Sequence, residues 1–171
     1  MLSLFKYIDT FVCDVDGVLT DSSLILVNDG QMARKVNIKD GYALQLAVKK
    51  GYKIIILSGG TSEAVLQRFS KLGITDIFLN VDNKVDKLTA FVNANKLTWD
   101  KMLFMGDDIP DYASMQLVGL PACPLDAVPE IKQISKYISP LTGGNGCVRD
   151  VIEKVLKLNG HWDLNNSIAS K

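Results

Sequence analysis

The chain has 171 residues, of which 47% are hydrophobic, and its 19 Lys and Arg residues equal its Asp and Glu residues in number. This length favours one domain, assigned to residues 1–171, with enough apolar residues for a sizeable core. Balanced charge provides no basic field, and no apolar run reaches the roughly 18–20 residues that cross a bilayer, so neither nucleic acid nor a membrane is expected as a partner.

The three cysteines, Cys13, Cys123 and Cys147, show neither a disulfide framework nor the spacing of zinc ligands. The N-terminal residues lack the basic region, apolar stretch and cleavage site of a signal peptide. We therefore expect reduced thiols and a cytoplasmic location. Neighbouring residues on a strand point to opposite faces, so Cys13, which precedes Asp14, is expected to fill core space rather than act as a nucleophile.

Apolar runs alternate with amphipathic stretches along the chain. The predicted strands are residues 11–13, 53–57, 76–79, 102–105 and 119–122. The predicted helices are residues 40–50 with Asp40 as the cap, a helix capped by Thr61 and stopped by Gly73, and residues 84–94, 111–117 and 148–158. This alternation predicts an α/β, Rossmann-like three-layer fold with a mostly parallel central sheet.

A hairpin is predicted at about residues 23–38, because Asn28-Asp29-Gly30 supplies the positive-φ residues of a tight turn. An isolated two-stranded hairpin is marginally stable and would expose apolar edges, so we expect it to pair with other chains. The alternative is a hairpin that folds back over its own sheet. Residues 163–171 carry few apolar groups and are expected to fray. The apolar hairpin residues are Leu24, Leu26, Val27 and Val36.

Polar side chains follow four predicted strand–loop junctions. They are Asp14 and Asp16, then Ser58, then Lys84, then Asp107 and Asp108. Because the carboxyl ends of parallel strands share one edge of a sheet, we expect these groups to converge. Each motif alone has a simpler interpretation, such as a turn, a helix cap or a solvated charge, and Asp-x-Asp-Gly alone could begin a calcium loop. The remaining ligands of that loop are missing, and clustered carboxylates suit Mg²⁺.

The first motif suggests phosphoryl transfer through an aspartate. Asp14, at a strand end, can attack phosphorus in line and form an aspartyl phosphate. Asp16, two residues further on, can protonate the leaving alcohol and then deprotonate the attacking water. Gly17 lets the backbone turn tightly and approach a phosphate.

The later motifs supply binding groups. Ser58 can donate to a phosphoryl oxygen beside the backbone N–H groups that follow it, and Lys84 can neutralise the nucleophile and the phosphoryl group. Asp107 can ligate Mg²⁺, with Asp108 as a second ligand or as an anchor for one of its waters.

The segment Asp14-Val15-Asp16-Gly17-Val18-Leu19-Thr20, with Ser58, Lys84 and Gly106-Asp107-Asp108, resembles the four motifs of the haloacid dehalogenase-like phosphatases, over about residues 7–158. The resemblance implies that Asp14 is the nucleophile and Asp16 the acid/base. It further implies that Ser58, Gly59 and Lys84 bind phosphate, and that Mg²⁺ is held by Asp14, the Asp16 carbonyl and Asp107.

The spacing of the motifs narrows the resemblance. Only about 40 residues separate Thr20 from Ser58 and about 25 separate Ser58 from Lys84, too few for a cap domain. The chain therefore resembles the capless branch, that of the 3-deoxy-D-manno-octulosonate 8-phosphate phosphatases, and further matches are residues 36–42, 72–74, 83–84 and 143–150. This resemblance implies a phosphorylated sugar acid as substrate, lipopolysaccharide biosynthesis, and a homotetramer with a central barrel of hairpins and active sites closed by neighbouring subunits.

Other residues carry weaker implications. The glycine-rich segment 143–146, which opens the tail of residues 143–171, is either a flexible connector or a segment that closes the site, with Arg149 meeting a carboxylate or phosphate. Arg68 and Lys71 are either solvated helix charges or contacts to a substrate carboxylate in the adjacent subunit's site. Many relatives carry arginine where this chain has Gly60, which leaves the exact sugar acid open.

Three alternatives remain. One is a phosphatase for a nine-carbon 2-keto-3-deoxy sugar acid 9-phosphate, of the nononate or sialic acid type. Another is a phospho-accepting receiver domain, against which the position of Lys84 before the second acidic pair argues. The third is a non-catalytic scaffold, which the intact motif residues disfavour.

Overall fold

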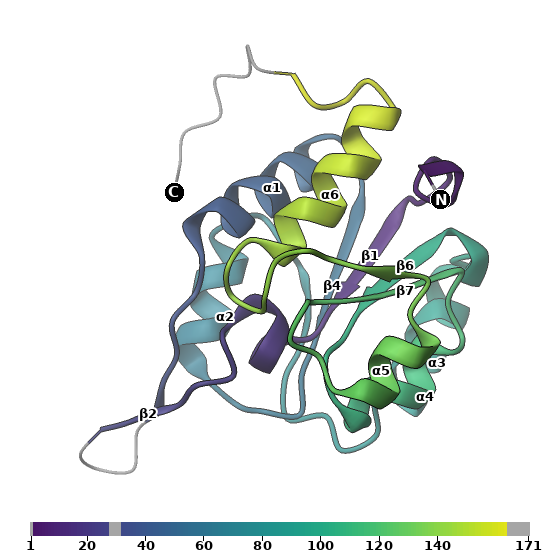
Figure 1. The fold of residues 1–171 in the computed structure, drawn as a ribbon. Coiled ribbons are helices and arrows are strands. Elements are labelled where there is room, and N and C mark those ends of the chain that lie inside the picture. The colour runs from purple at the N-terminus through teal and green to yellow at the C-terminus, as the bar shows by residue number, and fades with distance from the viewer. Residues whose placement is uncertain (1, 28–31, 164–171) are drawn as a thin grey trace.

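The computed structural model describes residues 2–27 and 32–163. Six parallel strands form the central sheet in the order β5-β4-β1-β6-β7-β8 (Figure 1). They are β1 (Thr10–Cys13), β4 (Lys53–Leu57), β5 (Asp76–Phe78), β6 (Met102–Met105), β7 (Leu120–Cys123) and β8 (Tyr137–Ile138). The predicted α/β fold with a parallel sheet is confirmed.

Helices cover both faces of this sheet. One face carries α1 (Ile38–Lys49), α2 (Glu63–Ser70) and α6 (Cys147–Leu158), and the other carries α3 (Lys84–Asn95), α4 (Tyr112–Met115) and α5 (Pro129–Ile134) (Figure 1). Strand side chains alternate between the faces, so Cys13 and Ile56 join the first core whereas Val12 and Leu57 join the second. Apolar residues on both faces explain why the strand sequences are continuous apolar runs.

In the described part of the chain, four short helical turns complete the connections. They are η1 (Leu2–Leu4), η2 (Val15–Leu19), η4 (Trp99–Lys101) and η5 (Ile109–Asp111). The predicted helix at residues 111–117 is divided between η5 and the single turn of α4. Apart from short turns, α5 and β8 were not predicted. The strand β8 has only two residues, too few to show a period-2 pattern, and it lies at the edge of the sheet.

Two predicted helix caps were wrong. Asn37 caps α1 by accepting a hydrogen bond from the Lys39 N–H, and Asp40 lies inside the first turn, 1% exposed. The helix begins two residues before Asp40, whose Oδ1 accepts the Arg149 N–H of α6 instead. Ser62, rather than Thr61, caps α2 by accepting from the Val65 N–H.

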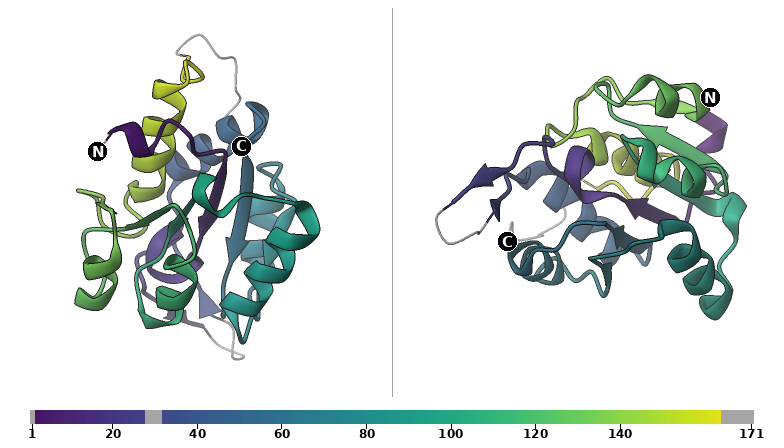
Figure 2. Two further views of the ribbon diagram at one scale, coloured as in Figure 1. Left: turned by 90° about the vertical axis from the view of Figure 1, so that its right-hand side faces the viewer. Right: turned by 90° about the horizontal axis from the view of Figure 1, so that it is seen from below.

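The predicted hairpin is present and extends away from the sheet (Figures 1 and 2). Its strands β2 (Ile25–Leu26) and β3 (Met32–Ala33) are antiparallel, and the interpretation that they fold back over the sheet is wrong. The predicted turn at Asn28-Asp29-Gly30 and most of the segment expected to fray, residues 164–171, lie outside the described residues. Among the described residues, no cap domain lies between the motifs. The exposed apolar side chains of the hairpin are Leu24, Ile25, Leu26, Val27 and Met32.

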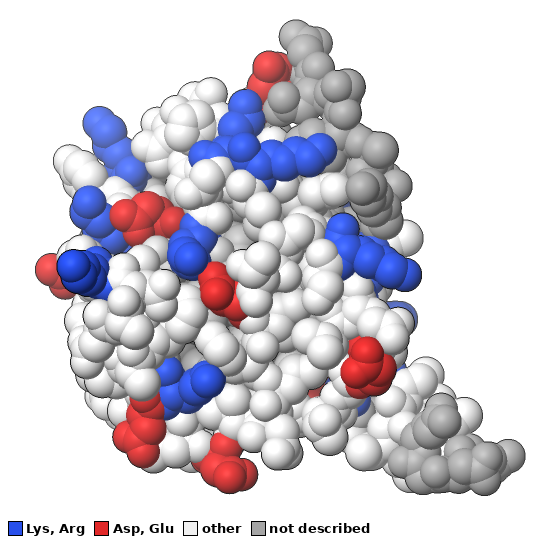
Figure 3. Space-filling model, turned by 180° about the vertical axis from the view of Figure 1, so that it is seen from behind, with Lys and Arg blue, Asp and Glu red and all other residues white. Residues whose placement is uncertain are grey.

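Charged side chains of both signs occur across the face opposite to that of Figure 1 (Figure 3). Across residues 2–27 and 32–163, none of the helices combines the length and the apolar character needed to traverse a bilayer.

Candidate active site

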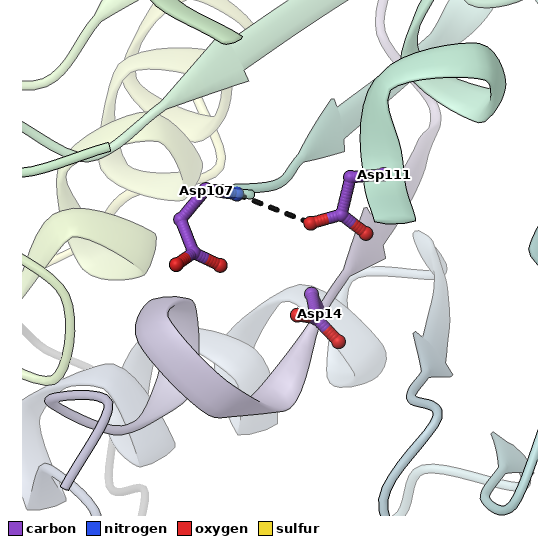
Figure 4. Close-up of side chains that lie close together, drawn as sticks. All are labelled: Asp14, Asp107 and Asp111. Carbon is purple, nitrogen blue, oxygen red and sulfur yellow. Dashed lines mark hydrogen bonds between the residues drawn. The ribbon is translucent and has the colours of Figure 1, made fainter. Parts of the chain in front are cut away.

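The ends of β1 and β6 bring the two acidic motifs together. The Asp14 N–H donates to the Met105 carbonyl at 3.1 Å, which extends the pairing of β1 with β6 to their carboxyl ends. Carboxylate oxygens of Asp14, Asp107 and Asp111 lie within 4.8 Å of one another (Figure 4). The chain leaves β1 toward β4 on one side and returns to β6 on the other, a position where α/β sheets commonly bind ligands.

Asp111 is a site residue that the sequence analysis missed. It ends η5, is fully buried, and accepts the Asp107 N–H through Oδ2 at 3.1 Å and Lys84 Nζ through Oδ1 at 2.6 Å. Its spacing of four residues from Asp107, about one helical turn, was a signal that could have identified it.

Lys84 lies between two carboxylates. Its Nζ is 2.8 Å from Asp14 Oδ1 and 2.6 Å from Asp111 Oδ1, and its side chain is 7% exposed. Burial lowers the pKa of Lys84, but the charges of Asp111 and Asp14 outweigh burial and leave that pKa raised. The ammonium group therefore stays charged beside the carboxylate of Asp14.

The single positive charge of Lys84 compensates the acidic cluster only in part. Burial, reinforced by the charge of Asp111, raises the pKa of Asp14 to about 7. Burial, reinforced by Asp14 and Asp111, raises the pKa of Asp107 to about 8, and Asp107 Oδ1 is buried with no hydrogen-bond partner among the described residues. Buried carboxylate oxygens that lack full charge compensation favour a hard divalent cation, so this set of ligands fits Mg²⁺.

The carboxylates differ in their availability to a cation. Asp111 uses one oxygen for Lys84 and the other for the Asp107 N–H, so Asp14 and Asp107 are the better direct ligands. Asp108 is exposed and caps η5, with Oδ1 accepting the Ile109 N–H at 2.8 Å. It lines the cleft but lies outside the three-carboxylate cluster, and its role as a ligand stays a prediction.

Gly17 is required by its conformation and by its neighbour. Its φ is +94°, a region that side chains rarely adopt, and a Cβ there would lie 2.0 Å from Asp107 Oδ2. The absence of a side chain therefore lets the first acidic loop approach the second.

Ser58 follows β4 and is directed into a cleft of about 540 Å³. Its Oγ accepts the Gly60 N–H at 3.1 Å, which leaves the hydroxyl proton available for a ligand oxygen. The same cleft is lined by Asp14, Asp16, Gly59, Lys84 and Asp107, so the predicted convergence of the four motifs is observed.

Arg34 is a second residue that the sequence analysis missed. Its Nε donates to Asp16 Oδ1 at 2.7 Å and its Nη2 donates to Asp16 Oδ2 at 3.1 Å. The two residues are 18 positions apart, with Arg34 just after β3 and Asp16 in the first acidic loop, so no local pattern connects them.

Arg68, Lys71 and Arg149 do not line the cleft of their own chain. Arg149 pairs with Glu153 at 3.0 Å, and its guanidinium lies 5.1 Å from the centre of the Trp162 ring. The predicted substrate contacts of these three side chains stay predictions.

The glycine-rich segment 143–146 packs against the first acidic loop. The Gly144 N–H donates to the Val18 carbonyl at 2.9 Å, and a Cβ on Gly143 would lie 2.1 Å from the Gly17 carbonyl oxygen. The interpretation as a flexible connector is therefore wrong, because the glycines permit close backbone contact.

Cys13 faces the core formed with α1, α2 and α6. Burial raises the pKa of its thiol far above the ordinary range, with further contributions from Asp40 and Asp14. The thiol stays protonated, so the prediction that it fills core space is confirmed.

Comparison with known proteins gives relatives that span most of the chain. The 3-deoxy-D-manno-octulosonate 8-phosphate phosphatase of Escherichia coli strain K12 is 30% identical over 152 residues, which cover 89% of this chain and 81% of that protein. None of the protein-family models that were compared matches the sequence.

Solved structures agree with this relationship. The 3-deoxy-D-manno-octulosonate 8-phosphate phosphatase from Moraxella catarrhalis, in complex with magnesium, phosphate and 3-deoxy-D-manno-octulosonate (KDO), is 30% identical with a TM-score of 0.88, over 92% of this chain and 90% of that one. The cobalt-bound enzyme from Haemophilus influenzae is 25% identical with a TM-score of 0.87, over 92% of each chain. The chain therefore belongs to the 3-deoxy-D-manno-octulosonate 8-phosphate phosphatase family, in the capless branch of the haloacid dehalogenase-like superfamily.

Proposed function

We propose that this chain is a Mg²⁺-dependent phosphomonoesterase that hydrolyses 3-deoxy-D-manno-octulosonate 8-phosphate to the free sugar acid and phosphate. The observation that carries the proposal is the placement of Lys84 Nζ, 2.8 Å from Asp14, beside the carboxylates of Asp107 and Asp111 at the ends of β1 and β6. Family membership supplies the substrate.

In the first step, a carboxylate oxygen of Asp14 attacks phosphorus and the bond from phosphorus to the ester oxygen breaks. The leaving oxygen takes a proton from Asp16, which lines the same cleft and is 37% exposed on its side chain. The products of this step are the free sugar acid and an aspartyl phosphate on Asp14.

In the second step, Asp16 removes a proton from water, and the water oxygen attacks the phosphorus of the aspartyl phosphate. The bond between phosphorus and Asp14 breaks, which restores the carboxylate and releases inorganic phosphate. Asp16 thus donates a proton in one step and recovers one in the next.

The remaining side chains bind and neutralise. Ser58 Oγ and the backbone N–H of Gly59 donate to phosphoryl oxygens, and Lys84 holds the carboxylate of Asp14 in place while balancing its charge. Asp14, Asp107 and the Asp16 carbonyl would hold Mg²⁺, with Asp108 and Asp111 next to them. The ion, when bound, screens the repulsion between the anionic nucleophile and the anionic ester.

We further propose a homotetramer in which hairpins from four chains associate and neighbouring subunits close each active site. The exposed apolar side chains Ile25 and Leu26, 59% and 79% exposed, support the proposal because an apolar hairpin in water favours association. The positions of Arg68, Lys71 and Arg149 outside their own cleft are consistent with contacts to a neighbouring subunit's substrate. Light scattering should give a tetramer for the parent and smaller species for Leu26→Lys.

The proposed setting is lipopolysaccharide synthesis in the cytoplasm. The three cysteines are free and buried, as expected in a reducing compartment.

The test is phosphate release with Mg²⁺ from the eight-carbon 8-phosphate, compared with 2-keto-3-deoxynononate 9-phosphate and sialic acid 9-phosphate. We expect the highest kcat/KM for the eight-carbon ester. Preference for a nine-carbon ester would move the substrate assignment and keep the mechanism, whereas no release from any ester would contradict both. A phosphoenzyme lifetime of minutes or more would instead favour a receiver domain.

A further inference from the structure

The Arg34 side chain is buried although arginine is mostly exposed in proteins. Only 7% of it is accessible, and it follows β3 on the returning strand of the hairpin. Two residues later, Val36 forms an antiparallel bridge with Thr20, which fixes this strand beside the first acidic loop. The hairpin therefore places a guanidinium group inside the body of its own chain.

Arg34 engages both oxygens of the Asp16 carboxylate. The distances are 2.7 Å from Nε to Oδ1 and 3.1 Å from Nη2 to Oδ2. A two-point contact with a planar guanidinium fixes the rotation of a carboxylate, which a single contact does not. Asp16 is thus held from one side and remains accessible to the cleft from the other.

The pair lies close to Ser58, and Asp16 and Ser58 line the same cleft. A Cβ on Gly60 would lie 3.1 Å from Arg34 Nη2, 3.1 Å from Asp16 Oδ2 and 3.5 Å from Ser58 Oγ. Gly60 therefore leaves the space that the guanidinium and the carboxylate share. This places the ion pair next to the hydroxyl assigned to a phosphoryl oxygen.

From this geometry we infer that Arg34 is a positioning residue, which orients the Asp16 carboxylate for proton transfer to the leaving oxygen. The inference rests on the proposed function, because it takes Asp16 as the general acid. A general acid must lie within hydrogen-bond distance of the atom it protonates, and a displacement of about 1 Å can cost about 10²-fold in rate. The hairpin then contributes to chemistry through Arg34, in addition to any role in association.

The test compares two esters that differ in their need for an acid. The sugar acid phosphate has an alkoxide leaving group that must be protonated, whereas p-nitrophenyl phosphate has a stable phenolate leaving group. Arg34→Ala should lower kcat/KM by about 10²-fold for the sugar ester and by less than about 5-fold for the aryl ester, because general acid catalysis typically contributes 10²–10⁴-fold. Arg34→Lys, which retains the charge but not the two-point contact, should show an intermediate loss with the same dependence on leaving group.

The matched control is Lys35→Ala, which removes a cation from the next residue. Lys35 is 67% exposed and pairs with Asp21 at 3.0 Å, outside the cleft, so both esters should be hydrolysed at the parent rate. Melting temperature and oligomeric state are measured for every variant. If Arg34→Ala does not fold, Arg34→Lys carries the same comparison.

A second measurement uses the sugar ester alone. In an Asp16→Ala background, Arg34→Ala should cause no further loss, because its effect passes through Asp16. Three outcomes would each overturn the inference. They are an equal loss in kcat/KM for both esters, a loss that adds to that of Asp16→Ala, and an Arg34 variant that is faster than the parent. Failure of the proposed function is separately visible, since the parent would then not hydrolyse the sugar ester or Asp16→Ala would not impair it.

Discussion

The backbone N–H of Arg149 donates to Oδ1 of Asp40 at 2.6 Å, which joins the first turn of α6 to the first turn of α1 at a buried carboxyl group. The other oxygen, Asp40 Oδ2, is buried and has no hydrogen-bond partner among the described residues. Because the glycine-rich segment 143–146 precedes α6 directly and contacts the first acidic loop, this junction links the last helix to the active site.

Asp40→Asn tests the electrostatics of that junction. Burial raises the pKa of Asp40 from 3.8 to about 6, and the hydrogen bond from the Arg149 N–H opposes this rise only in part. A raised folded-state pKa means that the stability from this group is present in full below about pH 4 and is lost as the pH rises through about 6. Asparagine keeps the acceptor without the charge.

The free energy of unfolding of Asp40→Asn relative to the parent should therefore increase between about pH 4 and pH 7, by about 3 kcal/mol at most. Chemical denaturation across this pH range measures it. The exposed Asp100→Asn serves as the control and should show no such trend. A difference for Asp40→Asn that does not vary with pH would contradict the argument.

Asp14→Asn should abolish hydrolysis and keep the fold, because the shape is retained and only the nucleophile is lost. We expect kcat below about 10⁻³ of the parent, as for other removed nucleophiles of a catalytic unit. Phosphate release and circular dichroism measure the two effects. Cys13→Ala, one residue earlier, should lose stability through a small cavity but retain kcat, since its thiol stays protonated and faces the core. Retained turnover in Asp14→Asn would exclude this carboxylate as nucleophile.

Asp111→Asn should impair the enzyme more than Asp108→Asn. Asp111 is fully buried and accepts from both Lys84 Nζ and the Asp107 N–H, whereas an amide has one acceptor oxygen and can retain only one of these contacts. Asp108 is exposed and caps a short turn. Steady-state kinetics should give a loss in kcat/KM of about 10²-fold for Asp111→Asn and about 10-fold or less for Asp108→Asn, since misplaced catalytic groups cost about 10²-fold. The reverse order would assign the principal role to Asp108.

Stabilisation by Mg²⁺ should increase with pH. Without metal, the raised pKa values of about 7 for Asp14 and about 8 for Asp107 mean that their contribution to stability is complete below about pH 4 and is lost as the pH rises through these values. A bound cation favours the charged carboxylates and removes this loss.

The difference in melting temperature between Mg²⁺ and a chelator should therefore grow from about pH 6 to about pH 8.5. Asp107→Asn should reduce that difference at every pH, because it removes one ligand and its charge. A metal-induced shift that stays constant or falls over this range would show that protons do not compete with the cation at these carboxylates.

Much of the fold followed from the sequence alone. Continuous apolar runs at 53–57 and 102–105 identified strands buried on both faces, and the groups that follow each strand identified the edge where they converge. The wrong helix-cap prediction at Asp40 arose because this side chain forms its hydrogen bond with a different helix. Asp40 has the residue type of a cap but serves α6, and Asn37 takes its place.

The sequence by itself determined which residues gather at the site. Each lies within three residues of a strand end or at a helix start, so the local pattern was sufficient to identify Asp14, Asp16, Ser58, Lys84 and Asp107. Only the tertiary structure revealed the parts that depend on distant contacts. Asp111 completes the ion-pair network with Lys84, 27 residues away, and Arg34 reaches Asp16 from a hairpin 18 residues away. Such contacts leave no periodic signal, because they depend on how separate elements pack around the sheet.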